Sequence, residues 1–326
     1  MKSLILNALS IPVFRNIIDI IIALVATPCA IILRTYRRIG SGKLPLTTKV
    51  LKLIGLFPIT DHYYEPLFND KALIAPLSND RNLPGINMNI LGQLDFIESL
   101  NFASELIALE LHKSTDKSDM FYFGNGSFES GDAEFLYQFI RTVRPNKIIE
   151  IGSGYSTRIA RLALRRNRLE TGCSVRHVCI EPYEMQWLEE LDGINILRKR
   201  VEDCDVLWTS ELASGDLLFI DSSHIIRPQG DVIKEYLEIL PQLSAGVYVH
   251  IHDIFTPKDY LHDWIVNHVR FWNEQYLLEA LLSNSERYEI VAALNYLKHH
   301  HYDKLKNICP YLTSEREPVS FYIRIR

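Results

Sequence analysis

Residues 147–157 read Lys-Ile-Ile-Glu-Ile-Gly-Ser-Gly-Tyr-Ser-Thr, and this stretch decides the fold. Its apolar half, 147–151, predicts a short buried strand, and the run from residue 156 has apolar positions at helical spacing. Gly152 and Gly154 stand between the two, where glycine lets the backbone turn tightly and a ligand approach closely. The stretch therefore predicts a strand, a turn and a helix, with a ligand bound at the turn.

Two further residues of this stretch indicate the kind of ligand. Thr157 stands where the dinucleotide-binding pattern has its third glycine. Glu150 precedes Gly152 by two positions, and a pyrophosphate would gain nothing from an acid there, whereas a cationic ligand would. These departures favour a cationic, nucleotide-type ligand and make an NAD-dependent oxidoreductase the weaker alternative.

Strand and helix patterns alternate along the chain after this stretch. Strand patterns occupy residues 174–181, 194–198, 216–221 and 246–253, and helical patterns separate them. Such alternation predicts an α/β fold with a doubly wound, mostly parallel sheet. Two more strand patterns, at 288–294 and 319–325, bring the expected sheet to seven strands.

Acidic residues end several of these predicted strands. Glu181 ends the second strand, 27 residues after Gly154, which is a suitable position for binding two ribose hydroxyls. Glu202 follows the third strand and is within reach of an adenine edge, and Asp221 ends the fourth strand. Ligands of open parallel sheets bind outside the carboxyl ends of the strands, so these residues are expected to converge there.

Over about residues 120–326 the chain resembles the class I S-adenosylmethionine-dependent methyltransferases. The resemblance rests on Glu-Ile-Gly-Ser-Gly at 150–154, on Glu181, and on Phe-Ile-Asp-Ser-Ser-His at 219–224. It implies a Rossmann-like fold with S-adenosylmethionine as cofactor, the two glycines beside the methionine part, Glu181 on the ribose and Glu202 near the adenine. The expected cofactor-binding residues are Glu150, Gly152, Gly154, Ser156, Thr157, Glu181, Glu202 and Asp221.

Histidines and aspartates near the ends of the fourth and fifth strands are the catalytic candidates. Methyl transfer to a hydroxyl needs an aligned acceptor and removal of a proton. His224 or His252 is the expected general base, with Asp221 beside them, and purely structural hydrogen bonding is the alternative for each histidine. The expected reaction is O-methylation of a small molecule or a glycan.

Asp221 and Asp253 end adjacent predicted strands and together suit Mg²⁺, which would orient an acceptor diol. Metal-dependent methyltransferases of the resembling class often carry a further acid or amide where this chain has Ile254. That departure leaves other roles open for Asp221, either a contact with the amino group of the cofactor or a loop cap.

The N-terminal region differs in charge and hydropathy from the rest. Residues 1–60 carry eight Lys or Arg and one acid, whereas residues 61–326 carry 27 basic and 39 acidic side chains. Residues 17–33 are apolar or small apart from Asp19, and residues 44–59 predict an amphipathic helix of the interfacial kind. We expect attachment to a membrane surface through residues 1–57, and the alternative is a helical hairpin packed on the main domain or in a homo-oligomer interface.

The remaining expectations concern organisation and compartment. The predicted parts are an apolar and basic helical segment over 1–60, a loop-rich and helical cap over 61–132, and the S-adenosylmethionine-binding catalytic domain over 133–326. Five cysteines without a C-x-x-C pair favour a reducing, cytoplasmic side, and the arginines after the apolar run agree with it. The acidic bulk argues against nucleic-acid binding. A non-catalytic scaffold with the same fold is the alternative from another functional class.

Overall fold

The computed structural model describes residues 12–111 and 120–326. Two ranges lie outside the described residues: 1–11, which begin the segment predicted over 1–60, and 112–119, which fall within the cap predicted over 61–132. The chain divides into two compact units, Met1–Leu73 and Ile74–Arg326, and each is described by itself.

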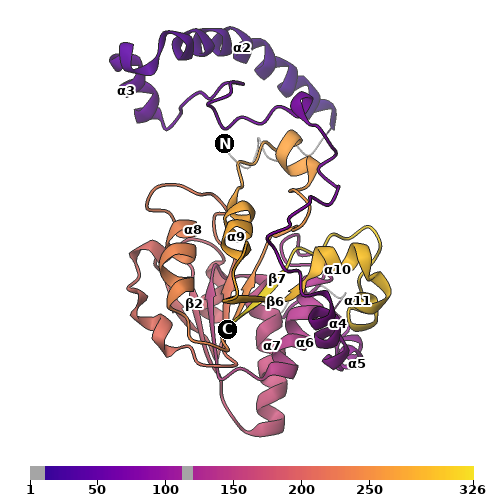
Figure 1. Ribbon diagram of the computed structural model, residues 1–326. Coiled ribbons are helices and arrows are strands. Elements are labelled where there is room, and N and C mark those ends of the chain that lie inside the picture. Colours follow the sequence, from indigo (N-terminus) through magenta and orange to yellow (C-terminus); the bar gives the residue numbers. More distant parts are fainter. Residues whose placement is uncertain (1–11, 112–119) are drawn as a thin grey trace. The chain divides into compact units, whose positions relative to one another are not determined.

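A seven-stranded sheet forms the centre of the larger unit (Figure 1). The strand order is β3-β2-β1-β4-β5-β7-β6, in which β1 to β5 run parallel and β7 is antiparallel to both of its neighbours. The predicted doubly wound, mostly parallel sheet is thus confirmed. The strands are β1 (Lys147–Ile151), β2 (Arg176–Ile180), β3 (Asn195–Leu197), β4 (Leu217–Ile220), β5 (Tyr248–Ile251), β6 (Tyr288–Ala293) and β7 (Phe321–Ile325).

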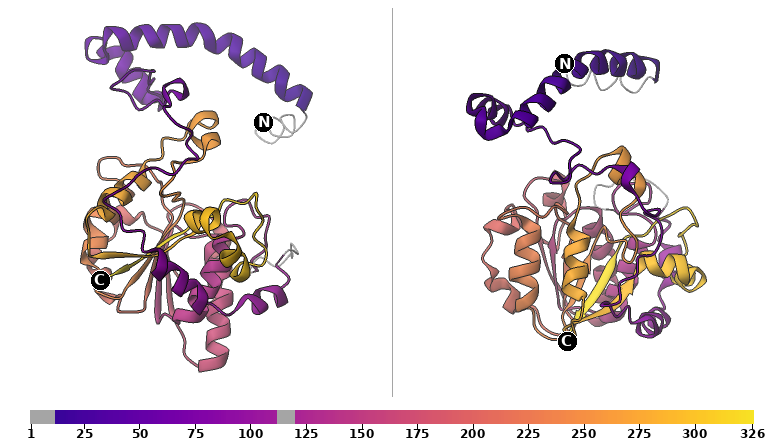
Figure 2. Two further views of the ribbon diagram at one scale, coloured as in Figure 1. Left: turned by 45° about the vertical axis from the view of Figure 1, so that its right-hand side comes forward. Right: turned by 45° about the horizontal axis from the view of Figure 1, so that its top comes forward.

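Helices cover both faces of this sheet (Figure 2). Successive residues of a strand point to opposite faces, so Ile148 enters one core and Ile149 the other. The Ile148 core includes α4 (Ile90–Ser99), α5 (Ala103–Ala108), α6 (Asp132–Val143), α7 (Tyr155–Thr171), α10 (Leu294–His300) and α11 (Tyr302–Ile308). The Ile149 core includes α8 (Asp231–Lys234), its continuation η6 (Glu235–Ile239) and η7 (Leu240–Gln242), and α9 (Glu274–Leu282).

Some helices are shorter than their sequence patterns suggest. The pattern of residues 89–111 suggests one long helix, but the structure has two helices there, α4 and α5, because Leu100 takes an extended conformation. The run 184–191 forms only the 3₁₀ turn η3 (Gln186–Glu190), which begins after Met185 at a φ of 53°. The pattern of residues 258–282 suggests two helices, of which the first is only the single π-helical turn η8 (Asp263–Asn267) and the second is α9.

The described part of the smaller unit, residues 12–73, contains two helices beyond its turns. The first, α2 (Pro12–Ile39), has 28 residues, includes Pro28, and is longer than the apolar run of the sequence. Its most apolar window has a mean hydropathy of 2.3 with none of the window buried. One such helix near an N-terminus is weak evidence of a membrane span, because signal sequences share these properties.

The second helix of this unit, α3 (Pro45–Ile54), follows the 3₁₀ turn η1 (Ser41–Lys43) and ends at Gly55 in the left-handed conformation. Leu46, Leu53 and Ile54 are strongly exposed on it. The end of α2 is tied to α3, since the Tyr36 hydroxyl lies 2.6 Å from the Thr48 hydroxyl. Apolar side chains are therefore exposed to solvent on both α2 and α3.

Candidate functional site

The glycine turn after β1 touches the end of β4. Gly152 has a φ of 79°, in the left-handed region that favours glycine, and a Cβ there would overlap the carbonyl oxygen of Asp221. The Gly152 amide donates to the Ile180 carbonyl, and the Asp221 amide donates to the Ile151 carbonyl at 2.8 Å. Glycine at 152 is thus what allows the ends of β1, β2 and β4 to meet.

Glu150 supports this turn from inside the protein. Its side chain is buried, with one carboxylate oxygen 2.7 Å from His177 Nε2 and the other accepting from Thr157 Oγ1 at 2.6 Å and Ser156 Oγ at 3.3 Å. Burial opposes the charge on His177, but Cys179 and Glu150 raise the pKa of His177 to about 10. The hydroxyls of the first turn of α7 are therefore bonded to a buried acid, and Gly154 donates its amide to Thr157 Oγ1.

Glu181 lies just after β2 with its carboxylate oriented by backbone amides. Oε1 accepts from the amides of Tyr183 and Glu184, both at 2.8 Å, and Oε2 lies 3.3 Å from the Ser153 amide. Oε2 retains acceptor capacity beside the glycine turn, so the residue fits a ligand that carries hydroxyls. Glu202 lies on the 3₁₀ turn η4 (Val201–Asp203), with an oxygen 3.9 Å from Arg227.

Two carboxylates and two imidazoles gather at the ends of β4 and β5. His224 Nε2 lies 3.3 Å from Asp221 Oδ1 and 3.2 Å from Asp253 Oδ2. His252 Nδ1 lies 3.6 Å from Asp221 Oδ1 and 3.5 Å from Asp253 Oδ1. His224 and Asp253 both have a φ of 60°, an uncommon conformation for side-chain-bearing residues that clusters at functional sites. We call these four residues the acid–imidazole cluster.

Buried carboxylates on other elements flank the two histidines of the cluster. Glu274, at the start of α9, accepts a hydrogen bond at 2.8 Å from His224 Nδ1, and its other oxygen accepts from the Tyr236 hydroxyl at 2.9 Å. Asp132, at the start of α6, lies 3.9 Å from His252 Nε2 and accepts from the amides of Val319 and Ser320. Each imidazole of the cluster therefore has carboxylates on both sides.

The charges of the cluster shift one another's ionisation. Burial disfavours the charged Asp221, but His252 and His224 hold the pKa of its carboxyl below the ordinary value. Burial also opposes the imidazolium forms, yet Asp253 and Asp221 raise the pKa of His252 to about 9. Asp221, Glu274 and Asp253 likewise raise the pKa of His224 well above its ordinary value. The carboxylates thus favour positive charge beside them.

His250 does not join the cluster, although it lies on the same strand. Its ring stacks on Tyr322 with centroids 4.1 Å apart, and burial and His252 lower the pKa of His250 well below its ordinary value. Both ring nitrogens are buried without a hydrogen-bond partner in the described part of the chain. His250 is therefore a neutral core residue.

The cluster has the donor set of a divalent-cation site. One ligand atom each from Asp221, His252 and Asp253 lie within 4.8 Å of one another. Both nitrogens of His252 also lack a close hydrogen bond among the described residues. Carboxylate oxygens suit Mg²⁺, and an imidazole nitrogen beside them also suits Mn²⁺ and other transition metals. The residues present therefore fit a metal ion.

The sequence did not predict the role of Glu274. The residue lies 50 positions after its hydrogen-bond partner His224, so no local pattern links them. The available signal is a charged residue at the first position of a mostly apolar helix, and Glu274 is fully buried there. Buried acids are almost always paired, so such a position marks an ion pair or a hydrogen-bond network.

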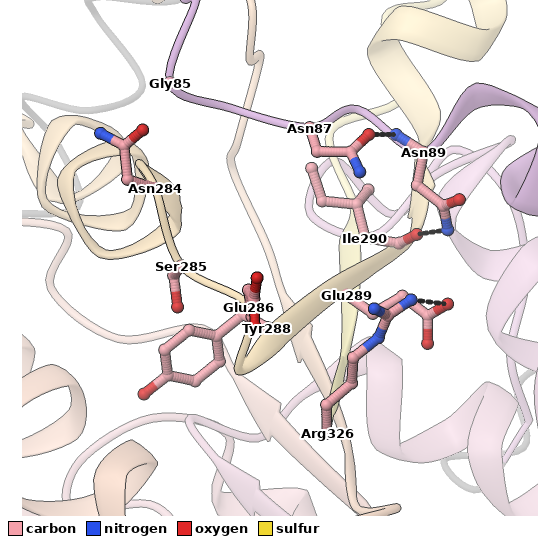
Figure 3. Close-up of a pocket in the computed structure, with 10 residues that line it drawn as sticks. All are labelled: Gly85, Asn87, Asn89, Asn284, Ser285, Glu286, Tyr288, Glu289, Ile290 and Arg326. Carbon is pink, nitrogen blue, oxygen red and sulfur yellow. Dashed lines mark hydrogen bonds and ion pairs between the residues drawn. The ribbon is translucent and has the colours of Figure 1, made fainter.

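A separate hollow of about 710 Å³ lies at the start of β6 (Figure 3). Asn87, Asn89, Glu289 and Arg326 are among its lining residues, and none of the predicted site residues lines it. Arg326 pairs with Glu289 at 3.0 Å, and Asn89 donates to the Ile290 carbonyl. Because β6 runs in the same direction as β5, its start lies at the edge of the sheet opposite the acid–imidazole cluster.

Comparisons with known proteins place part of the chain in a protein family and find a relative with a similar sequence. Residues 149–254, which include the glycine turn and the whole cluster, match the model of a methyltransferase domain. An uncharacterized protein of Archaeoglobus fulgidus is 31% identical over 167 residues, which are 48% of this chain and 74% of that protein.

Solved structures with some similarity are methyltransferases with S-adenosylhomocysteine bound. An O-methyltransferase from Bacillus cereus is 13% identical, with a TM-score of 0.37 over 71% of this chain and 91% of that chain. A putative protein-L-isoaspartate O-methyltransferase from Plasmodium falciparum is 14% identical, with a TM-score of 0.29 over 49% of this chain and 83% of that chain. By its matched methyltransferase domain and the order of its sheet, the chain is a class I S-adenosylmethionine-dependent methyltransferase.

Proposed function

We propose that this methyltransferase acts on a hydroxyl oxygen of a small molecule or a glycan, with His224 as the general base. The observation that carries the proposal is the acid–imidazole cluster, which lies where β4 ends, in contact with the glycine turn of β1. A hydroxyl acceptor must lose a proton during transfer, and a histidine is suited to take it.

Between the two histidines, the contacts favour His224 as the base. Glu274 holds its Nδ1, so the ring presents Nε2 to the edge where Asp221 and Asp253 lie. A carboxylate on one nitrogen fixes the tautomer and leaves the other nitrogen for the substrate proton. His252 instead shares the donor set that suits a metal, and we assign it to binding.

We also propose which residues hold the cofactor. S-adenosylmethionine supplies, when bound, an electrophilic methyl group on a positively charged sulfonium. Glu181 would accept hydrogen bonds from the ribose hydroxyls, and Gly152 and Gly154 would let the methionine part approach the backbone. Glu150, Ser156 and Thr157 would brace the turn, and Glu202 would lie near the adenine. Asp221 would contribute negative charge at the junction of cofactor and acceptor.

A metal ion is part of the proposal for the acceptor side. Asp221, Asp253 and His252 would hold it, and a divalent cation there lowers the pKa of a hydroxyl bound to it. The carboxylates would then share their negative charge between the metal and His224. That sharing would weaken the hold on the His224 proton and bring its pKa closer to neutrality.

We propose that the protein is located at a membrane, to which its N-terminal unit attaches it. The exposed apolar side chains of α2 and α3, together with Arg34, Arg38, Lys49 and Lys52, suit a bilayer and its anionic headgroups. The arginines at the end of α2 favour a cytoplasmic position for the chain beyond this helix. A packed hairpin or a homo-oligomer interface remains the competing use of the same surface.

The test is calorimetric titration of the full chain, in detergent micelles, with S-adenosylhomocysteine and separately with NADH. We expect binding of the first only. Glu181→Ala should weaken it about 5- to 150-fold, which corresponds to about 1–3 kcal/mol for unpaired hydroxyls. Glu184→Ala is the control, because this exposed residue contacts Glu181 through its backbone amide, which alanine keeps. Lack of binding at high micromolar ligand would favour the scaffold.

A further inference from the structure

Two tryptophans and an arginine form a compact group in the segment after β5. The rings of Trp264 and Trp272 meet edge to face with centroids 5.0 Å apart. The guanidinium carbon of Arg270 lies 4.5 Å from the centroid of Trp264 and 4.3 Å from that of Trp272. The Arg270 amide also donates to the Trp264 carbonyl at 2.9 Å. The guanidinium is therefore held by two aromatic faces.

This group lies at the catalytic edge of the sheet. The Trp272 ring is centred 4.3 Å from the His224 ring. The amides of Asn273 and Glu274, the next residues along the chain, both donate to the His224 carbonyl. Arg270 is thus two residues away from Trp272, whose ring contacts the proposed base. The two hydrogen bonds to the His224 carbonyl hold this segment beside His224.

Among residues 12–111 and 120–326, no acid lies within ion-pair distance of Arg270, whose charge acts on the Asp253 carboxylate from farther away. Arg81 differs, because it is bonded to Glu279 and lies 3.2 Å from Asp259. Cation–π contacts engage the flat face of a guanidinium and leave the N–H donors at its edge free. Those donors match the two oxygens of a carboxylate or a phosphate.

We propose that Arg270 binds an oxyanion of the acceptor and so selects acidic acceptors for this enzyme. The inference rests on the proposed function, since it places the acceptor hydroxyl at His224 and the acidic group at Arg270. Around the cluster the protein is rich in carboxylates, including Asp132, Asp221, Asp253 and Glu274, which would repel an acidic molecule. A fixed cation beside them provides the point of attachment that such a molecule needs.

The test compares ligands that differ in one charged group. Methyl β-D-glucuronide and methyl β-D-glucoside share their ring hydroxyls and differ by a carboxylate, and glucose 6-phosphate and glucose differ by a phosphate. Binding to the full chain is measured by calorimetry with and without S-adenosylhomocysteine. We expect the wild type to bind at least one acidic ligand at least tenfold more tightly than its neutral partner, and the two pairs distinguish carboxylate from phosphate.

Variants then assign the preference to Arg270. Arg270→Gln should abolish the preference, and Arg270→Lys should keep part of it, because lysine retains the charge without the paired donors. Arg168→Gln, an exposed position on α7, is the control and should leave the preference unchanged. Thermal unfolding of each variant excludes loss of the fold as the cause.

The outcomes separate this inference from the proposed function. Equal binding of acidic and neutral ligands by a wild type that binds S-adenosylhomocysteine would overturn the role of Arg270 alone. An unchanged preference in folded Arg270→Gln would do the same. A preference that depends on Arg270 in a protein that binds no S-adenosylhomocysteine would support the anion site and overturn the proposed function.

Discussion

Gly152 and Asp221 are packed so closely that a methyl group on the glycine would overlap the Asp221 carbonyl oxygen. Gly152→Ala should therefore lower the free energy of unfolding by about 2–5 kcal/mol, through overpacking and a left-handed alanine. Urea unfolding measures the change. Gly193→Ala is a matched control, because Gly193 also has a φ of 79° and nothing lies within 4 Å of its Cβ position. Equal losses in both variants would show that backbone strain alone is responsible.

The proposed base can be separated from its neighbour by substitution. His224→Asn should reduce kcat by about 10²–10⁴-fold, the usual contribution of a general base, and leave affinity for S-adenosylhomocysteine unchanged. Glu274→Gln should reduce kcat less, because a glutamine still accepts a hydrogen bond from His224 Nδ1. Steady-state kinetics and calorimetry provide the two measurements. Full activity in His224→Asn with loss in His252→Asn would reassign the base, and exposed His268→Asn is the control.

Metal dependence is the third prediction. Treatment with EDTA should lower turnover, and added Mg²⁺ or Mn²⁺ should restore it, if Asp221, His252 and Asp253 hold the ion. Asp253→Asn should weaken Mn²⁺ binding, measured by electron paramagnetic resonance of the free ion. Turnover that EDTA does not change would remove the metal from the mechanism.

The ion pair between Arg141 of α6 and Glu105 of α5 should make the free energy of unfolding depend on pH. Hydrogen bonds from Arg141 hold the pKa of Glu105 below its ordinary value, against the effect of burial. A lowered folded-state pKa stabilises the protein above the unfolded-state pKa of about 4.3, and this stabilisation disappears as pH falls through the folded-state value. Arg141 is buried, so Glu105→Gln should cost about 1–3 kcal/mol at pH 7.

The difference between wild type and Glu105→Gln should shrink as pH falls from about 5 to about 3, as measured by urea unfolding at each pH. Glu98→Gln is the control, since Glu98 is exposed and pairs with exposed Lys304. A difference that stays constant with pH would contradict the ion-pair explanation.

Membrane attachment is the fifth prediction. Ile22→Arg combined with Val25→Arg places two charges near the middle of α2, at a cost of about 2.5–3.5 kcal/mol each in a bilayer. The variant should move from the membrane pellet toward the supernatant in carbonate extraction. Ile39→Arg, at the helix end, should remain in the pellet. A wild type found wholly in the supernatant would contradict the anchor.

The parallel strands and the edge of the sheet at which their acidic ends gather were predictable from the sequence. Ile148 and Ile149 illustrate why, because adjacent apolar residues in a five-residue run indicate burial on both faces, as in a parallel sheet covered by helices. Asp221 and Asp253 end neighbouring strands, so the local pattern is enough to place them together. The identity of the cofactor was predicted from the family resemblance, because the periodicity of the sequence alone does not indicate a cofactor.

Contacts between distant segments were not predictable. The ring of His250 stacks on Tyr322, which lies on a strand 72 residues later, so the pattern of β5 alone left His250 among the histidines near the site. The predicted helix lengths were wrong for a different reason. The run 184–191 contains good helix formers, but Met185 takes a left-handed conformation that helix propensity does not indicate.

The two hydrogen bonds from Asn273 and Glu274 to the His224 carbonyl have a consequence for evolution and engineering. They join the segment that carries Arg270 and the tryptophans to the strand end that carries the proposed base. A change of acceptor size can then be made between residues 263 and 271 without disturbing the proton-transfer geometry, provided that Trp272, Asn273 and Glu274 stay in place. A loop exchanged with a relative should therefore be cut before Trp272, so that this junction is inherited from the host protein.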